Sequence, residues 1–302
     1  MVDLSSRKSP LSDAQANRLV KLYDQGEKEI LQNINKMLLK NPASRSALYQ
    51  KQVLDRVRQI RGDLLSGART WTHEAPLAGY IEGFKWADAD ALAGKGIIAG
   101  FGSIHQQAIS ALADQAYSRL VSVDNTIART TEDIFSTIAQ KQSLGAVVGY
   151  KTTLQAAKGI EKDLAEHGVT GFVDRSGREW DMGRYTKMLA QETVNQSFRT
   201  GTANRLMEHG HDLVIVSEHD SSCPDCAEFQ GEVFSLSGND PYYPPLSEAE
   251  DGGLFHVGCL HVLSLAPEEA DLFIGALEGD QGDEARDQEI QDLIDAYDAS
   301  HE

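Results

Sequence analysis

Cysteine is scarce in this chain of 302 residues, which has only three, at positions 223, 226 and 259. Because three cysteines cannot all pair within one chain, a framework of disulfides is excluded. Two of them form a CxxC pair, and in a reducing compartment such a pair more often marks a metal or redox site than a structural disulfide. The three cysteines are therefore the first candidates for chemistry.

Long apolar runs are also missing. The opening MVDLSSRKSP has no apolar core, so it is not a secretory signal. No run approaches the ~18 apolar residues that a membrane-spanning helix needs. Apolar residues nevertheless make up 41% of the chain, which is enough to bury a core and argues against a mostly disordered protein. We expect a soluble protein that is made in a reducing cytoplasm.

Basic residues are outnumbered, and the formal net charge is -18. The excess is uneven, because residues 268–302 hold 13 acidic residues and one basic residue, Arg286, for a net charge of -12. The rest of the chain then carries -6. A protein that bound duplex DNA by neutralising phosphates would need a basic face. The composition gives no sign of such a basic face, although it does not exclude a local basic patch.

After a polar, flexible N-terminus at residues 1–10, apolar residues recur at helical spacing through residues 11–167. Ser12 and Asp13 are suitable caps for a first helix, and Asn41-Pro42 ends it. Pro76 suits the first turn of a later helix. The first two helices form an αα-hairpin in this interpretation. The predicted helices cover residues 12–40, 44–65, 75–93, 103–141 and 144–166.

After Gly168 the pattern changes to short strands around one helix, which predicts a small α+β domain at residues 168–266. Arg175-Ser176-Gly177 is typical of a hairpin turn. A helix is expected at 185–209, and strands at DLVIVSEH, GEVFSL and LFHVGCLHVLSL, the last being a strand or a knuckle. Residues 267–302 form an acidic tail with one short amphipathic helix. That helix is either solvated or disordered, or it docks into a partner groove.

Two pairs of metal-ligand residues share the same spacing. Cys223-Pro-Asp-Cys226 can bind one ion from a tight turn, and His256-Val-Gly-Cys259 repeats this geometry. Zinc prefers such thiolate and imidazole ligands in a tetrahedral arrangement. His261 competes with His256 for the fourth position, and we favour His256. The alternatives are three buried thiols with two ordinary histidines, or a redox CxxC. The fold class is thus a mainly α N-terminal region followed by an α+β domain with a zinc-stapled knuckle pair.

Catalytic zinc would need an open position and a nearby general acid or base. Four protein ligands are available here, which favours a closed, structural site. The HExxH motif and the HxE that precedes PCxxC in zinc deaminases are both absent. The nearest carboxylates in sequence are Glu218, Asp220 and Asp225. Glu192 and Arg199 lie on a predicted helix, where a salt-bridged face is favoured over a catalytic one.

The motifs of residues 168–266 occur together in one family. They are GREW followed by a Tyr-containing helix, a strand leading into CPDC, the turn GEVFSLSG, and the closing HVGCLH. This segment resembles the tailed-phage minor capsid protein 2 family, which is related to the Mu F-like head morphogenesis proteins. The chain departs from the family pattern at Val257, where proline is usual, and at Leu260, where arginine or another polar residue is common.

The resemblance implies a virion protein that is made in the host bacterial cytoplasm and lies inside the capsid near the portal. It implies a non-enzymatic role in head assembly and in DNA packaging or delivery, with several copies per virion. The implied partners are the portal protein and the major capsid or scaffolding protein. Binding to packaged DNA is an open alternative, and no membrane is expected as a partner. The motif residues carried over as metal ligands are Cys223, Cys226, His256, Cys259 and His261, for a structural zinc ion. The alternative is a zinc-dependent hydrolase or nuclease carried in the virion.

Overall fold

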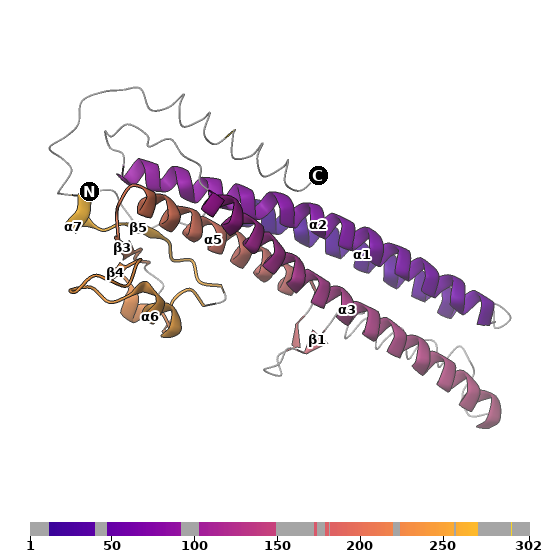
Figure 1. Ribbon diagram of the computed structural model, residues 1–302. Coiled ribbons are helices and arrows are strands. Elements are labelled where there is room, and N and C mark those ends of the chain that lie inside the picture. The colour runs from indigo at the N-terminus through magenta and orange to yellow at the C-terminus, as the bar shows by residue number, and fades with distance from the viewer. Residues whose placement is uncertain are drawn as a thin grey trace. The chain divides into compact units, whose positions relative to one another are not determined.

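The protein is mainly helical, with a small three-stranded antiparallel sheet near its C-terminus (Figure 1). The computed structural model describes residues 12–39, 47–91, 103–148, 172–173, 179–180, 182–219, 224–256, 258–270 and 291. The long helices are α1 (Ser12–Leu39), α2 (Ala47–Ala91), α3 (Ser103–Val148) and α5 (Met182–Glu208). The short elements are β1 (Phe172–Val173), β2 (Glu179–Trp180), β3 (Leu213–Val216), η2 (Ala227–Phe229), β4 (Val233–Ser235), α6 (Leu246–Asp251), β5 (Leu263–Leu265) and α7 (Pro267–Ala270). The predicted order of a helical region followed by helix and short strands is confirmed.

The chain forms two compact units, each built from separate segments. The helical unit comprises residues 16–71 and 116–187. The sheet unit comprises residues 1–15, 72–115 and 188–302. Each of the helices α1, α2, α3 and α5 supplies residues to both units. The domain boundaries predicted near residues 168 and 267 mark changes in the sequence pattern. They differ from the limits of the two compact units and stay predictions. No helix of the described residues is long and apolar enough to cross a membrane.

In the helical unit, α1 and α2 pack closely at two glycines. A Cβ added at Gly26 would lie 2.6 Å from the Leu64 side chain, and one at Gly67 would lie 2.8 Å from Leu22. Because these contacts run in opposite directions along the two helices, α1 and α2 are antiparallel, which confirms the predicted αα-hairpin. The buried side chains of this unit include Leu19, Tyr23, Ile30, Val53, Val57, Ile60, Leu64, Leu120, Val123 and Ile127.

The prediction of two separate helices at 44–65 and 75–93 was wrong, because α2 runs unbroken through both. Its buried stripe continues through the expected gap at Ala68, Trp71 and Ala75, so burial favours one helix. Pro76 lies inside the helix rather than in its first turn. A proline inside a helix costs roughly 3 kcal/mol because it removes one hydrogen bond and crowds the preceding turn. The burial of the flanking apolar residues outweighs this cost.

Helix α3 also passes through the expected break near residue 142 and ends at Val148. The remainder of the helix predicted at 144–166, the N-terminal segment 1–10 and the amphipathic helix of the acidic tail lie outside the described residues. The predicted hairpin is present, since Phe172 pairs with Trp180 and Val173 with Glu179 in antiparallel register.

In the sheet unit, α2 and α5 cross at glycines. A Cβ added at Gly83 would overlap the carbonyl oxygen of Phe198, and one at Gly201 would overlap the carbonyl oxygen of Tyr80. A Cβ at Gly79 would lie 2.9 Å from the carbonyl oxygen of Val194. The two backbones can approach this closely only because these positions carry no side chain.

The three-stranded sheet of the sheet unit has the order β4-β3-β5, and both pairings are antiparallel. Val214 is the central residue, opposite Phe234 on one side and Leu265 on the other. The Trp86 Nε1 atom donates a hydrogen bond of 3.2 Å to the Leu263 carbonyl, which ties α2 to the edge strand β5. The sheet therefore has a fixed position relative to the helices of its own unit.

Candidate metal centre

The loops that carry the predicted metal ligands leave the sheet at the same end. Val216, the last residue of β3, is paired with Leu263, the first residue of β5. The chain after β3 leads to Cys226, and the chain before β5 contains residues 256–261. Antiparallel pairing therefore brings two segments together that lie about thirty residues apart in the sequence.

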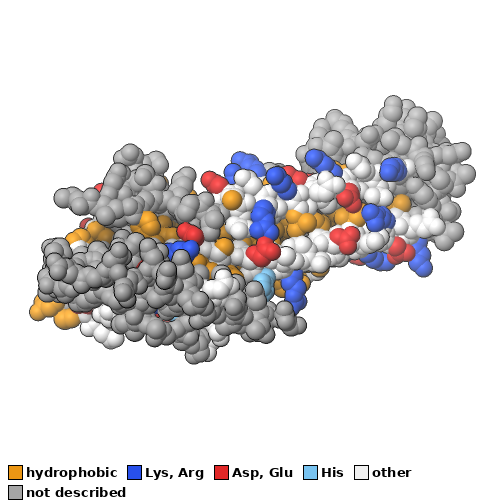
Figure 2. Space-filling view, turned by 90° about the horizontal axis from the view of Figure 1, so that it is seen from above, with side chains coloured by type: hydrophobic (Ala, Val, Ile, Leu, Met, Phe, Trp, Pro, Cys, Tyr) orange, Lys and Arg blue, Asp and Glu red, His pale blue; other side chains and the backbone are white. Residues whose placement is uncertain are grey.

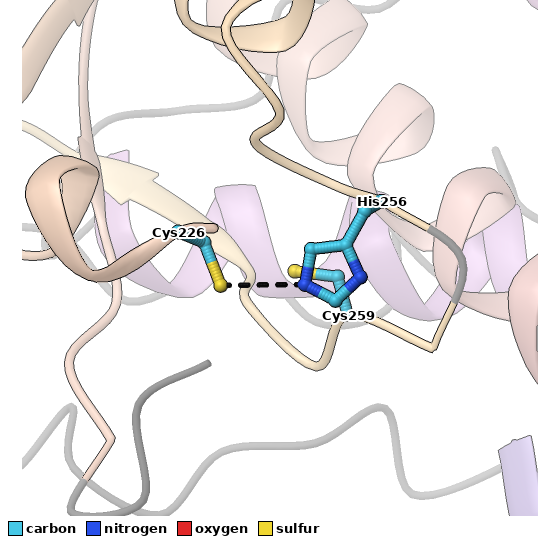
Figure 3. Close-up of side chains that lie close together, drawn as sticks. All are labelled: Cys226, His256 and Cys259. Atoms are coloured by element: carbon cyan, nitrogen blue, oxygen red, sulfur yellow. Dashed lines mark hydrogen bonds between the residues drawn. The ribbon is translucent and has the colours of Figure 1, made fainter. Parts of the chain in front are cut away.

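Cys226, His256 and Cys259 converge at this end of the sheet (Figure 3). One ligand atom of each lies within 4.8 Å of the others. The Cys226 Sγ atom lies 3.5 Å from the His256 Nε2 atom. On tetrahedral zinc, a sulfur bonded at about 2.3 Å and a nitrogen at about 2.0 Å stand roughly 3.5 Å apart. The three side chains could therefore hold a metal ion with little movement.

Both thiols of this group are almost completely buried, with 1% of Cys226 and 2% of Cys259 exposed. The turn that carries His256 and Cys259 is closed by a hydrogen bond of 2.9 Å from the Cys259 N–H to the His256 carbonyl. Gly258 has a φ of +86°, a left-handed conformation that glycine adopts without steric cost. The glycine thus allows the chain to turn sharply between His256 and Cys259.

His261 lies beside the group but is not one of the three converging ligands. Its Nδ1 atom is 3.1 Å from the Cys259 Sγ atom. The ring is buried and meets the His219 ring edge-on at 4.7 Å between centroids. Burial, followed by the charges of His219, His256 and Arg199, lowers the pKa of His261 to about 4. The imidazole is therefore neutral at physiological pH.

The other residues predicted near the metal site do not join the Cys226, His256 and Cys259 group in the described part of the chain. Cys223 and Asp220 lie outside the described residues. Glu218 and Asp225, the other carboxylates near the motif, are exposed. Among the described residues, no carboxylate belongs to the converging group. The structure thus brings together three of the five predicted ligands, and full ligation stays a prediction.

One face of α5 contacts the metal-ligand turn, which the sequence analysis did not foresee. The Asn195 Nδ2 atom donates a hydrogen bond of 3.4 Å to the Cys259 carbonyl. The Arg199 guanidinium lies 4.3 Å from the centre of the Phe255 ring and 3.6 Å from a Glu192 carboxylate oxygen. Burial lowers the pKa of Arg199, while the negative charges of Glu192 and Cys259 oppose this effect. This face is buried rather than solvated, and its i, i+3, i+7 spacing was the available signal.

A second buried polar cluster lies elsewhere in the sheet unit and was also missed. The His105 ring contacts the Tyr80 hydroxyl at 2.5 Å and a Glu208 carboxylate oxygen at 2.6 Å. The Arg205 guanidinium donates to Asp88 at 2.6 Å and to Glu208 at 3.1 Å. These contacts join the C-terminal part of α2, the start of α3 and the end of α5. Every charged group in them has a countercharge, which fits a structural role.

Comparison with protein families matches residues 11–265 to the model described as phage minor capsid protein 2. The match covers most of the chain, including Cys223, both helical and sheet elements, and the Cys226, His256 and Cys259 group. No curated protein and no solved structure matches the chain.

Proposed function

The chain belongs to the phage minor capsid protein 2 family, and from this membership we propose that it acts inside the virion head near the portal. Its roles there are head assembly and DNA packaging or delivery. The family match over residues 11–265 is the observation that carries the proposal. The family consists of structural capsid proteins, which fits a non-enzyme. The portal protein and the major capsid or scaffolding protein are the proposed partners of several copies per virion.

The Cys226, His256 and Cys259 group is proposed to hold a structural zinc ion. Two soft thiolates and one imidazole form a ligand set that zinc prefers, and the distance between Cys226 and His256 suits tetrahedral coordination. Cys223 is proposed as the fourth ligand because it completes the CxxC pair. Zinc would join the loop after β3 to the loop before β5, and metal binding of this kind contributes directly to folding.

The charged residues are unevenly distributed along the chain, and their distribution favours protein partners over DNA. Residues 206–285 contain no lysine or arginine at all, whereas residues 16–71 contain 11 basic and five acidic residues. DNA phosphates would be repelled by the acidic segment, which therefore suits protein partners. On the part of the face in Figure 2 that is not grey, basic, acidic and hydrophobic side chains are intermixed. A mixed surface of this kind suits contacts with capsid proteins better than phosphate binding.

The test combines metal analysis with assembly. Cys226→Ser and Cys259→Ser are introduced singly, and Ser247→Ala serves as a control at an exposed position of the same unit. Purified wild-type protein is expected to contain about one zinc ion per chain. Both cysteine variants should lose the zinc, unfold at lower temperature and enter phage heads less efficiently.

Two results would contradict the proposal in different ways. Wild-type protein that is stable without zinc would contradict the proposed metal site but not the proposed capsid role. Wild-type protein that never enters phage heads would contradict the proposed capsid role, whatever its metal content.

A further inference from the structure

His261 and His256 both lie close to the two buried cysteines, yet their contacts differ. Given the proposed metal site, on which this inference rests, we propose that His261 is a positioning residue and not a ligand. Its imidazole donates a hydrogen bond from Nδ1 to the metal-bound thiolate of Cys259. His256 coordinates the metal.

Distances separate the two roles. The Cys226 Sγ atom and the His256 Nε2 atom are 3.5 Å apart, which matches the roughly 3.5 Å between sulfur and nitrogen ligands of one tetrahedral zinc ion. The Cys259 Sγ atom and the His261 Nδ1 atom are 3.1 Å apart. Two zinc ligands this close would require a sulfur–zinc–nitrogen angle of about 90° instead of the tetrahedral value. A hydrogen bond to sulfur imposes no such distortion.

The chemistry of the thiolate fixes the direction of this hydrogen bond. A metal-bound cysteine is deprotonated, so its sulfur can only accept. The proton must therefore lie on the Nδ1 atom of His261, and that nitrogen has no lone pair left for a metal. The Nε2 atom is buried and has no hydrogen-bond partner in the described part of the chain. It also lies on the far side of the ring from the atom that faces Cys259.

The backbone holds His261 in place from the sheet. The Val262 N–H donates to the Ser217 hydroxyl at 3.0 Å, and the Ser217 N–H donates to the Val262 carbonyl at 3.0 Å. These bonds extend the pairing of β3 with β5 up to the residue after His261. On the other side of the turn, Asn195 donates to the Cys259 carbonyl. Cys259 is thus held through its sulfur by His261 and through its carbonyl by Asn195.

A hydrogen-bond donor that orients a metal ligand typically contributes 10–100-fold to metal affinity. The test uses cobalt(II) as the probe with the full-length protein, since its absorption reports the number and type of ligands. His261→Asn places an amide nitrogen where Nδ1 stands and can keep the hydrogen bond. His261→Gln is equally polar but places its amide one bond farther out. His256→Asn removes the proposed ligand.

The wild type should bind cobalt(II) with thiolate-to-metal absorption bands. His261→Asn should bind with similar affinity, and His261→Gln about 10–100-fold more weakly, both with the wild-type band pattern. His256→Asn should change the pattern itself. The inference is overturned if either His261 variant changes the band pattern, because His261 would then be a ligand. It is also overturned if the Asn and Gln variants have equal affinities. Wild-type protein that binds no cobalt(II) would overturn the proposed metal site, and the inference with it.

Discussion

The His256 Nε2 atom lies 3.5 Å from the Cys226 Sγ atom, although the two residues are 30 positions apart in the sequence. This contact closes the open end of the sheet, where the loop after β3 meets the loop before β5. A metal ion bound by these side chains would cross-link the two loops. The dependence of the sheet on that link can be measured.

Removing metal with a strong chelator should destabilise the sheet unit. The two loops would lose their cross-link, and the buried thiolates would lose the cation that compensates their charge. We expect a lower melting temperature and faster hydrogen exchange in β3 and β5, with much smaller changes in α1. Cys226→Ser already lacks a ligand and should show no further change with chelator. A chelator effect of equal size in that variant would mean that the chelator acts elsewhere.

The crossing of α2 and α5 should tolerate no side chain at Gly83. In Gly83→Ala, the new methyl group would overlap the Phe198 carbonyl oxygen, and both helices would have to move apart. Such overpacking typically costs about 1–3 kcal/mol, which denaturant unfolding can measure. Gly62→Ala is the matched control, since Gly62 is an exposed residue of the same helix with no atom near an added Cβ. The control should gain about 0.5–1 kcal/mol from helix propensity. Equal effects of the two changes would argue against the close crossing.

Pro76→Ala tests the continuity of α2. In an unbroken helix, alanine restores the N–H that can bond to the carbonyl four residues earlier and removes the crowding by the proline ring. The free energy of unfolding should then rise, by up to about 3 kcal/mol. If the helix instead began near residue 75, Pro76 would occupy a favourable first-turn position. The same substitution would then be neutral or destabilising.

The sequence was informative wherever the deciding interactions are local. Apolar spacing predicted α1, which begins at Ser12, one of the two predicted cap positions. The helix predicted at 185–209 corresponds to α5, which ends at Glu208, two residues before Gly210 with its φ of +81°. The strands β3 and β4 followed from short β-branched and aromatic runs. The predicted break between two helices at residues 66–74 was wrong. Pro76 is a local signal for a helix start, but the buried apolar stripe that runs along all of α2 favours one continuous helix.

The metal-ligand turns were also visible in the sequence, as two pairs with equal spacing. The spacing favoured His256 over His261 as the ligand, but it did not predict the contact of each ring, because only the fold decides which nitrogen faces which sulfur. The predicted salt bridge between Glu192 and Arg199 of α5 is present at 3.6 Å, but the burial of this helix face was not predicted. Polar residues on a helix are usually solvated, and only tertiary packing reveals that these are buried against the turn.

The buried cluster around Glu208 should make stability depend on pH at the acid end. Asn204 donates to the Tyr80 hydroxyl at 2.7 Å, Tyr80 lies 2.5 Å from one nitrogen of His105, and the other His105 nitrogen lies 2.6 Å from Glu208. Burial raises the pKa of Glu208, but hydrogen bonds and charges from His105 and then Arg205 outweigh it, so the pKa is lowered overall. The folded state therefore favours the ionised carboxylate.

A glutamate whose pKa is lower in the folded state binds fewer protons there than when it is unfolded. Its stabilising contribution is therefore complete above the unfolded pKa of about 4.3 and is lost as the pH falls through the folded value. Unfolding free energies measured from about pH 7 to about pH 3 should show this loss in the wild type. Glu208→Gln keeps an acceptor for His105 but cannot titrate, so it should be less stable at neutral pH and should approach the wild type in acid. Glu228→Gln, at an exposed position of the same unit, should leave the wild-type profile almost unchanged. A constant difference between Glu208→Gln and the wild type at every pH would show that Glu208 contributes through packing alone.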